Sequence, residues 1–170
     1  MTKQAVAKKD PETSAKSVWA YWRHCRPMVL LTSPVIYVCI IPFALLDLFV
    51  AVYQAICFRA NGIPKVRRSD YIIFDRGRLP YLNVMEKLGC LYCSYANGLL
   101  EYIGEITART EQHFCPIKHH VEPPHPHSRY DHFLPYGDAR AYKTGVGKVR
   151  NNFVDIKRAP AGAKHEPQER

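Results

Sequence analysis

The sequence lacks the short motifs that mark the common catalytic frameworks. It contains no G-x-S-x-G, no P-loop, no G-x-G-x-x-G and no H-E-x-x-H pattern. These absences remove the usual signatures of serine hydrolases, nucleotide-binding enzymes and zinc proteases. No catalytic residue is therefore assigned, and we expect that the chain is not itself an enzyme.

Acidic residues are few beside the basic ones. The chain has 15 Asp and Glu against 24 Lys and Arg, for a formal net charge of +9 and a pI near 9.3. This balance favours anionic partners, either acidic lipid headgroups or nucleic acid phosphates. Because the basic residues cluster beside a long apolar run, a bilayer with anionic headgroups is the predicted partner and nucleic acid is disfavoured.

Charge is almost missing from residues 35–58, where Asp47 is the only ionised side chain. A run of this length can cross a bilayer core of about 30 Å. The alternative is a helix buried in a soluble protein, but so small a chain would then have to cover the run on every side. It begins far from Met1, exceeds an ordinary signal-peptide core and has no small-residue cleavage pattern. We predict a retained membrane segment.

Five residues define the predicted membrane segment. Trp19, Trp22 and Arg23 precede the run and are typical of an interfacial anchor. Pro42 removes a backbone donor and is expected to kink the helix. Asp47 would cost about 3 kcal/mol at the centre of a bilayer, which the many apolar residues offset.

Helical spacing beyond the proline places Asp47, Ala51 and Gln54 on one face, so we expect a polar stripe toward protein, headgroups or a partner helix. Basic residues flank both ends of the run. The positive-inside rule favours a cytoplasmic C-terminal part at the bacterial inner membrane, and the basic flanks with a central proline also fit a re-entrant or in-plane helix, the arrangement we favour.

A second helix is predicted after Pro80. Apolar and aromatic residues recur there at alternating intervals of three and four, which predicts one long amphipathic helix, or two helices in phase, whose seam packs in a core. The seam is Met85, Leu88, Tyr92, Tyr95, Leu99, Tyr102 and Ile106. Glu105 and Arg109 are expected to pair across one turn on its exposed face.

Cysteine and histidine residues supply the inventory of a structural zinc site. A C-x2-C pair is followed by a cysteine and two histidines at C-x3-H spacing. The predicted metal ligands, for zinc or iron, are Cys90, Cys93, Cys115, His119 and His120. The cysteines are expected to be reduced, since two others lie inside the apolar run and no secretory signal accompanies them.

Geometry decides whether these ligands share one ion. An unbroken helix would hold Cys93 and Cys115 about 33 Å apart, so a shared site requires the chain to reverse near Gly104. Asn97-Gly98 is the stronger turn signal, but a turn there would place Cys115 opposite residues near Pro80, well past Cys90 and Cys93. The continuous spacing of the seam argues against either turn. Without one, Cys90 and Cys93 would act alone, as a redox pair or as ligands across a dimer.

Histidines gather again after the second helix. Proline and histidine alternate there in an irregular loop, where an independent metal site and plain solubility are equally good explanations. The residues concerned are Cys115, His119, His120, His125, His127 and His132.

Residues 33–142 resemble a group of uncharacterised bacterial membrane-associated proteins. The likeness rests on IPKVRRSDYIIFDRGRL, YLNVMEKLGCLYCSYANGLLEYIGEITARTEQHFCPIKHH and RYDHFLPYGDARAY. The resemblance implies a unit made of an apolar segment and a Cys-containing helical part. It implies no activity and no cofactor.

The sequence thus predicts a mainly α-helical, membrane-attached chain: one apolar helix, kinked or re-entrant, then a long amphipathic helix or helical hairpin and irregular loops. We expect a disordered basic tail (1–15), an interfacial anchor and membrane segment (16–58), a cytoplasmic helical domain with Cys and His (59–142) and a second disordered basic tail (143–170).

The predicted function is membrane-associated binding of zinc or iron, or a part in an assembly with a membrane-protein partner or a second copy of the chain. The alternative is a membrane-bound thiol redox or electron-transfer subunit that uses Cys90 and Cys93.

Overall fold

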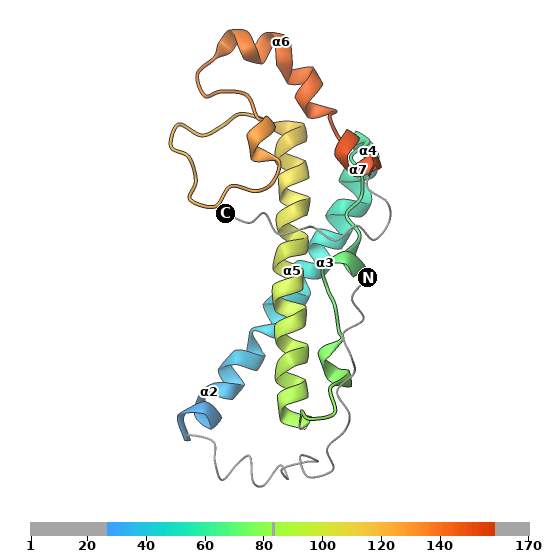
Figure 1. Ribbon diagram of the computed structural model, residues 1–170, viewed down its shortest axis with the longest axis vertical. Helices are drawn as coiled ribbons and strands as arrows, with labels where there is room; N and C mark the ends of the chain where they lie inside the picture. Colours follow the sequence, from blue (N-terminus) through green and yellow to red (C-terminus); the bar gives the residue numbers. More distant parts are fainter. Residues whose placement is uncertain (1–26, 83, 159–170) are drawn as a thin grey trace.

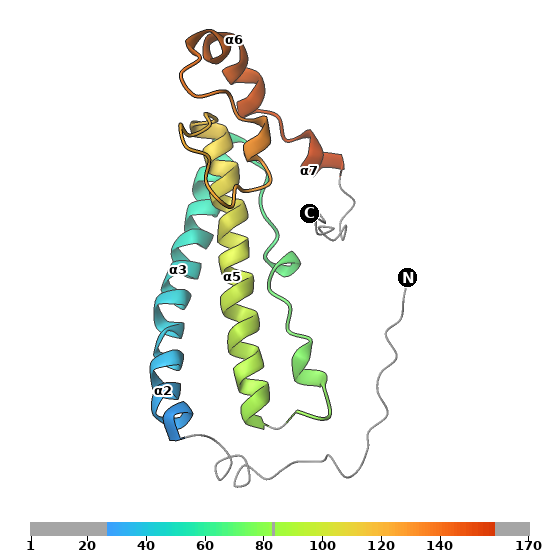
Figure 2. The same ribbon diagram turned by 60° about the vertical axis from the view of Figure 1, so that its left-hand side comes forward.

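The computed structural model describes residues 27–82 and 84–158 and is mainly helical, as predicted. Two long helical stretches lie side by side and run in the same direction (Figures 1 and 2). The first comprises α2 (Pro27–Val38), α3 (Ile40–Tyr53), the π-helical turn η2 (Gln54–Phe58) and α4 (Arg59–Asn61). The second is the single helix α5 (Val84–Phe114).

The connector, residues 62–82, leaves the first stretch through Gly62, whose φ of 67° ends α4 in the left-handed conformation that glycine adopts without strain. It then runs back along α5 to the start of that helix (Figure 2). Two short 3-10 turns interrupt it, η3 (Arg68–Asp70) and η4 (Arg76–Arg78). Helix α5 consequently lies between α3 and the connector.

The apolar stretch is interrupted at Cys39, between α2 and α3. Pro42 has no N–H to donate to the carbonyl of Val38 four residues earlier, so the α-helical ladder fails there. The Cys39 N–H donates to the Ile36 carbonyl at 3.2 Å instead, which is a tighter turn. Thus the break falls three residues before the proline that explains it.

A close crossing fixes the connector against α5 at Gly98. A Cβ added to Gly98 would lie 2.6 Å from the carbonyl oxygen of Tyr71 and 2.9 Å from the Cα of Ile72. Both neighbours are backbone atoms that cannot rotate away. Glycine is therefore needed here for contact between elements, which explains why Asn97-Gly98 is helical and makes no turn.

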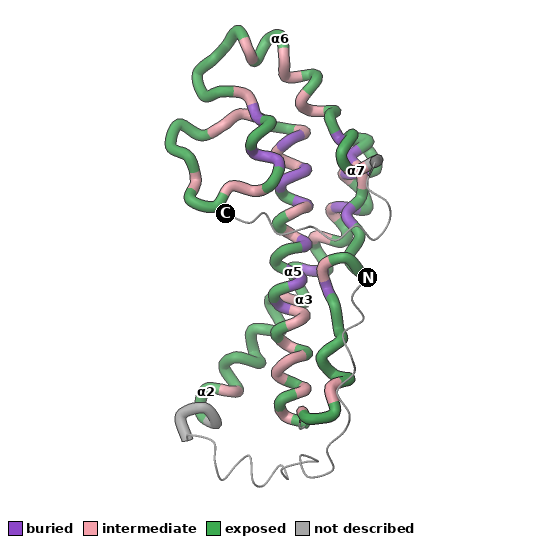
Figure 3. The backbone as a smooth tube through the Cα atoms, in the orientation of Figure 1, coloured by how far each residue is buried: buried purple, intermediate pink, exposed green. Residues whose placement is uncertain are grey.

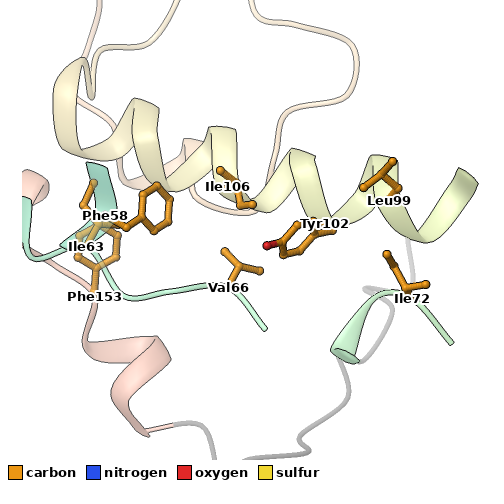
Figure 4. Close-up of a cluster of buried hydrophobic side chains, with 8 residues drawn as sticks. All are labelled: Phe58, Ile63, Val66, Ile72, Leu99, Tyr102, Ile106 and Phe153. Carbon is orange, nitrogen blue, oxygen red and sulfur yellow. The ribbon is translucent and has the colours of Figure 1, made fainter. Parts of the chain in front are cut away.

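The apolar core lies where α5, the end of the first helical stretch, the connector and the C-terminal segment meet (Figure 4). The predicted apolar face of α5 forms part of this core, since Leu99, Tyr102 and Ile106 are buried. Leu88, however, is 46% exposed, because it borders an open hollow between the connector and the first turns of α5. The buried cluster is Phe58, Ile63, Val66, Ile72, Leu99, Tyr102, Ile106 and Phe153.

The C-terminal region up to Arg158 differs from the disordered tail predicted over 143–170, and residues 159–170 lie outside the described residues. Two helices occupy the described part, α6 (Ala139–Arg150) and α7 (Val154–Arg158). Phe153 between them is buried in the core, and the Gln112 side chain donates to the backbone carbonyls of Val149 and Asn152 at 3.0 and 2.8 Å. Composition concealed this anchoring, since one aromatic residue and one glutamine hold a basic, polar segment.

The irregular region between α5 and α6 holds the short turn η5 (Tyr130–His132) and a single parallel bridge between Ile117 and Leu134. The predicted tail over residues 1–15 and the predicted anchors Trp19, Trp22 and Arg23 lie outside the described residues.

Candidate functional site

The shared metal site predicted from five ligands does not form in this structure. Helix α5 is unbroken from Val84 to Phe114, so Cys93 and Cys115 stand about 33 Å apart. The chain turns neither at Gly104 nor at Asn97-Gly98, because both positions are helical. Across residues 27–82 and 84–158, no group of three or more His, Cys, Asp or Glu side chains is placed to hold a metal ion.

The two predicted histidine ligands pack against different aromatic rings. His119 stacks on Tyr130 with ring centroids 5.9 Å apart, and its Nδ1 lies 3.3 Å from the tyrosine hydroxyl. His120 lies against Tyr136 at 5.1 Å. Both imidazoles therefore contribute to packing in the irregular region and point to no common centre.

His127 makes the best-defined histidine contact of this region. Its Nε2 lies 3.1 Å from a carboxylate oxygen of Glu111, and its Nδ1 accepts from the backbone N–H of Arg129 at 3.2 Å. The second bond leaves Nε2 as the N–H that donates to Glu111. The pair ties the irregular region to the last turns of α5.

The cysteines of the described residues are all free thiols. Cys90 is half-buried and Cys93, one turn later on α5, is exposed. Cys115 is exposed beyond the end of the helix.

The most distinctive chemistry lies where α3 and η2 meet α5, in a set of polar groups that we call the polar seam: the buried Asp47, Gln54 and Tyr102, the half-buried Tyr95 and the exposed Arg68. Asp47 is 7% exposed, accepts from the Tyr95 hydroxyl at 3.0 Å, and pairs with Arg68 at 2.6 Å. Gln54 is 6% exposed, donates to the Tyr102 hydroxyl, and accepts from the Val66 N–H.

The polar seam repeats at an interval of seven residues on both helices. Asp47 faces Tyr95, and Gln54, two turns later, faces Tyr102. Equal spacing on the two helices is possible only because they run in the same direction. The predicted polar stripe thus faces protein through Asp47 and Gln54, while Ala51 is exposed.

Burial at the polar seam also raises tyrosine pKa values. Removal from water raises the pKa of Tyr95, and the hydrogen bond that its hydroxyl donates to Asp47 adds to the effect. Burial likewise raises the pKa of Tyr102, although its hydrogen bond with Gln54 acts in the opposite direction. Both hydroxyls therefore stay protonated over the ordinary pH range.

The opposite face of the apolar helix carries what we call the apolar stripe: Val38, Ile41, Leu45, Phe49, Val52 and Ile56. These side chains are 49–69% exposed, and Figure 3 shows exposure along most of α2 and α3. The helical span Leu31–Asn61 is long and apolar enough to cross a membrane, and 6% of its most apolar window is buried within the described chain.

A buried ionic network occupies the C-terminal half of α5. Glu105 pairs with Arg109 at 2.7 Å, as predicted, but both side chains are buried, although exposure was expected. The reason is Arg129, from the irregular region, which pairs with the same carboxylate at 3.2 Å and donates to Gln112 at 2.9 Å. No local sequence signal marks this partner, which lies 24 residues away from Glu105.

Comparison with family models, curated proteins and solved structures gives no match for this chain. The resemblance to bacterial membrane-associated proteins stays a prediction, and the functional argument depends on the geometry described above.

Proposed function

We propose that the chain is a membrane-anchored assembly protein in which α2 and α3 lie in the plane of the bacterial inner membrane and hold the C-terminal part at its cytoplasmic surface. One observation supports this above all: the first helical stretch buries Asp47 of α3 and Gln54 of η2 and exposes the apolar stripe. Helices in water have the reverse arrangement, whereas helices against lipid hide their few polar groups in protein contacts.

Charge along α5 and the connector favours an in-plane helix over an upright one. On α5, the stretch without charge between Lys87 and Glu101 covers about 21 Å, less than the roughly 30 Å of a hydrocarbon core. The connector adds irregular backbone and the charges of residues 67–78 along α5, and upright insertion of the helices would place these in lipid. An in-plane helix needs only the apolar stripe to enter the membrane.

Arg59 is consistent with this orientation. It follows the stripe residue Ile56 by three positions, so it lies at the end of the same helical face, and it is exposed. A long cationic side chain there can reach lipid phosphates while its stem remains on apolar surface.

The test is a depth profile of the apolar stripe in vesicles. Single tryptophans at 38, 41, 45, 49, 52 and 56 would be read by quenching with lipids brominated at different chain positions. An in-plane helix gives one shallow depth of about 5–10 Å for all six positions. A depth that is greatest near position 45 and shallow at both ends would show a spanning helix, and six unquenched positions would refute membrane contact.

Binding of zinc or iron by Cys90 and Cys93 remains a second hypothesis. The two thiols lie one turn apart on α5 with Cys93 exposed, so a second chain would have to complete the ligand set. Elemental analysis of the detergent-purified protein, with Cys93→Ser as comparison, would detect about half a metal per chain for a dimer-bridging ion. Metal-free protein with unchanged melting in chelator would rule it out.

A further inference from the structure

A surface cavity of about 240 Å³ lies between the connector and the first turns of α5. Its walls are chiefly apolar, from Phe74, Val84, Leu88 and Leu91, and these side chains are 46–63% exposed. The cavity is larger than the roughly 150 Å³ that holds a benzene molecule in a protein interior, so it can accept part of an acyl chain.

Two cations line the same cavity, and no carboxylate does. Arg76 comes from η4 and Lys87 from the first turns of α5. Neither makes an ion pair with any residue of the described chain. An apolar hollow with two uncompensated cations is complementary to a molecule that has a hydrocarbon chain and an anionic head.

We propose that this cavity binds an acidic phospholipid, with an acyl chain between Phe74 and Leu91 and the headgroup phosphate at Arg76 and Lys87. The inference rests on the proposed membrane attachment, because it assumes access to a lipid leaflet. The cavity lies at the end of the molecule where α2 and α5 both begin, between η4 and α5 on the side of α5 that faces away from α2 (Figure 2), so a lipid must leave the leaflet beside the apolar stripe to enter it. Zwitterionic lipids fit less well, since their ammonium group would meet the two cations.

Cys90 provides a direct readout, because its side chain lines the cavity whereas exposed Cys93 does not. The full-length protein in detergent would be alkylated in the presence and in the absence of octyl phosphate. Mass spectrometry would measure the rate of modification at each cysteine. We expect octyl phosphate to slow alkylation of Cys90 at least tenfold and to leave Cys93 unchanged. Equal protection of both thiols, or protection of neither, would overturn the proposal.

Three further measurements separate the contributions of the hydrocarbon chain, the anionic group and the two cations. Octanol supplies the hydrocarbon chain without the anion, and inorganic phosphate supplies the anion without the hydrocarbon chain. Neither compound should protect Cys90 at the concentration at which octyl phosphate does. Protection by either one would overturn the two-part site. Arg76→Gln with Lys87→Gln should weaken octyl phosphate protection about thirtyfold, at roughly fivefold per cation. Arg78→Gln, in the same 3-10 turn but outside the cavity lining, is the matched control and should have no effect.

Vesicles then test the lipid itself. Phosphatidylglycerol in phosphatidylcholine vesicles should protect Cys90, whereas pure phosphatidylcholine should not. Flotation of the Arg76→Gln, Lys87→Gln variant distinguishes membrane attachment from lipid binding in the cavity. Its apolar stripe is intact, so this variant should still float with the vesicles. Flotation without protection of Cys90 in the wild-type chain would refute the lipid site alone, and failure of the wild-type chain to float would refute the membrane attachment.

Discussion

The two halves of α5 bury different kinds of polar groups and have different surroundings. Beside α3, in the N-terminal half, the buried polar groups are few, the charged one is Asp47, which pairs with the exposed Arg68, and the outer surface of the adjoining helix is apolar. In the C-terminal half, a connected set of charges is buried around Glu105. Under the proposed membrane attachment, one helix has a contact of the membrane-protein type at one end and of the soluble-protein type at the other.

This difference shows that burial of a polar residue does not by itself identify its solvent. Asp47 and Glu105 are buried to a similar extent, and each is satisfied by an arginine. What separates them is the far side of the contacting element: the apolar stripe behind Asp47 is exposed, and under the proposed membrane attachment it contacts lipid.

The largest expected effect removes the apolar character of the stripe. Leu45→Lys with Phe49→Lys introduces two charges, each worth about 3 kcal/mol against insertion at a bilayer centre and less at the interface. We expect vesicle partitioning, measured by flotation, to fall at least about 100-fold. Val121→Lys, at an equally exposed site outside the helices, should leave partitioning unchanged. Unchanged flotation of the double variant would show that the stripe does not contact lipid.

The next effect breaks the ionic network at the other end of α5. Glu105→Gln leaves Arg109 and Arg129 buried without their shared carboxylate, and loss of one member of a buried ion pair costs about 3–5 kcal/mol. Hydrogen exchange should rise across residues 115–158 while the contact between α3 and the N-terminal half of α5 stays protected. A uniform rise over the whole chain would contradict two separately stabilised halves.

Asp155→Asn is the matched control for that variant. Asp155 also pairs with Arg129, at 3.0 Å, but its own side chain is 63% exposed. A solvent-exposed partner contributes about 1 kcal/mol or less. Its exchange pattern should therefore remain close to that of the wild-type chain.

Sequence periodicity was sufficient to predict the two long helices. The alternating spacing from Tyr92 to Ile106 describes the buried side of α5, because a helix that packs on one side repeats its contacts every three or four residues. The inward orientation of Asp47 and Gln54 follows from the same geometry. These features depend on local spacing, which a single chain displays directly.

Features that depend on distant segments could not be read in this way. Arg129 and Phe153 lie in segments whose composition is that of loop and tail, and only the folded contacts show that both are buried. Asn97-Gly98 has the composition of a turn, and although helical spacing argued against one, only the folded contacts show that Gly98 admits the connector backbone. For the proposed metal ligands, residue types were correct for zinc, but the helix between them keeps Cys93 and Cys115 apart.

A smaller effect tests how the connector holds the two halves together. Gly98→Ala places a methyl group against the backbone of Tyr71 and Ile72, so the connector must shift at a cost of about 1–3 kcal/mol, which exceeds the helix-propensity gain of about 0.8–1 kcal/mol. Gly104→Ala, in the same helix with open space around it, receives the gain alone. Denaturation in detergent should show opposite signs for the two variants; stabilisation by both would mean that the crossing is loose.

The smallest expected effect is alkaline loss of the polar seam. Burial raises the pKa values of Tyr95 and Tyr102 in the folded chain above the ordinary value near 10. Because the folded state holds these protons more tightly than the unfolded state, their contribution to stability is complete below about pH 10 and falls as the pH rises through the folded pKa values. Tyrosinate absorbance should therefore show a late phase that Tyr95→Phe and Tyr102→Phe reduce. Ionisation of both residues together with the exposed tyrosines would mean that water reaches the contact between α3 and α5, and the asymmetry between the two halves of α5 would then disappear.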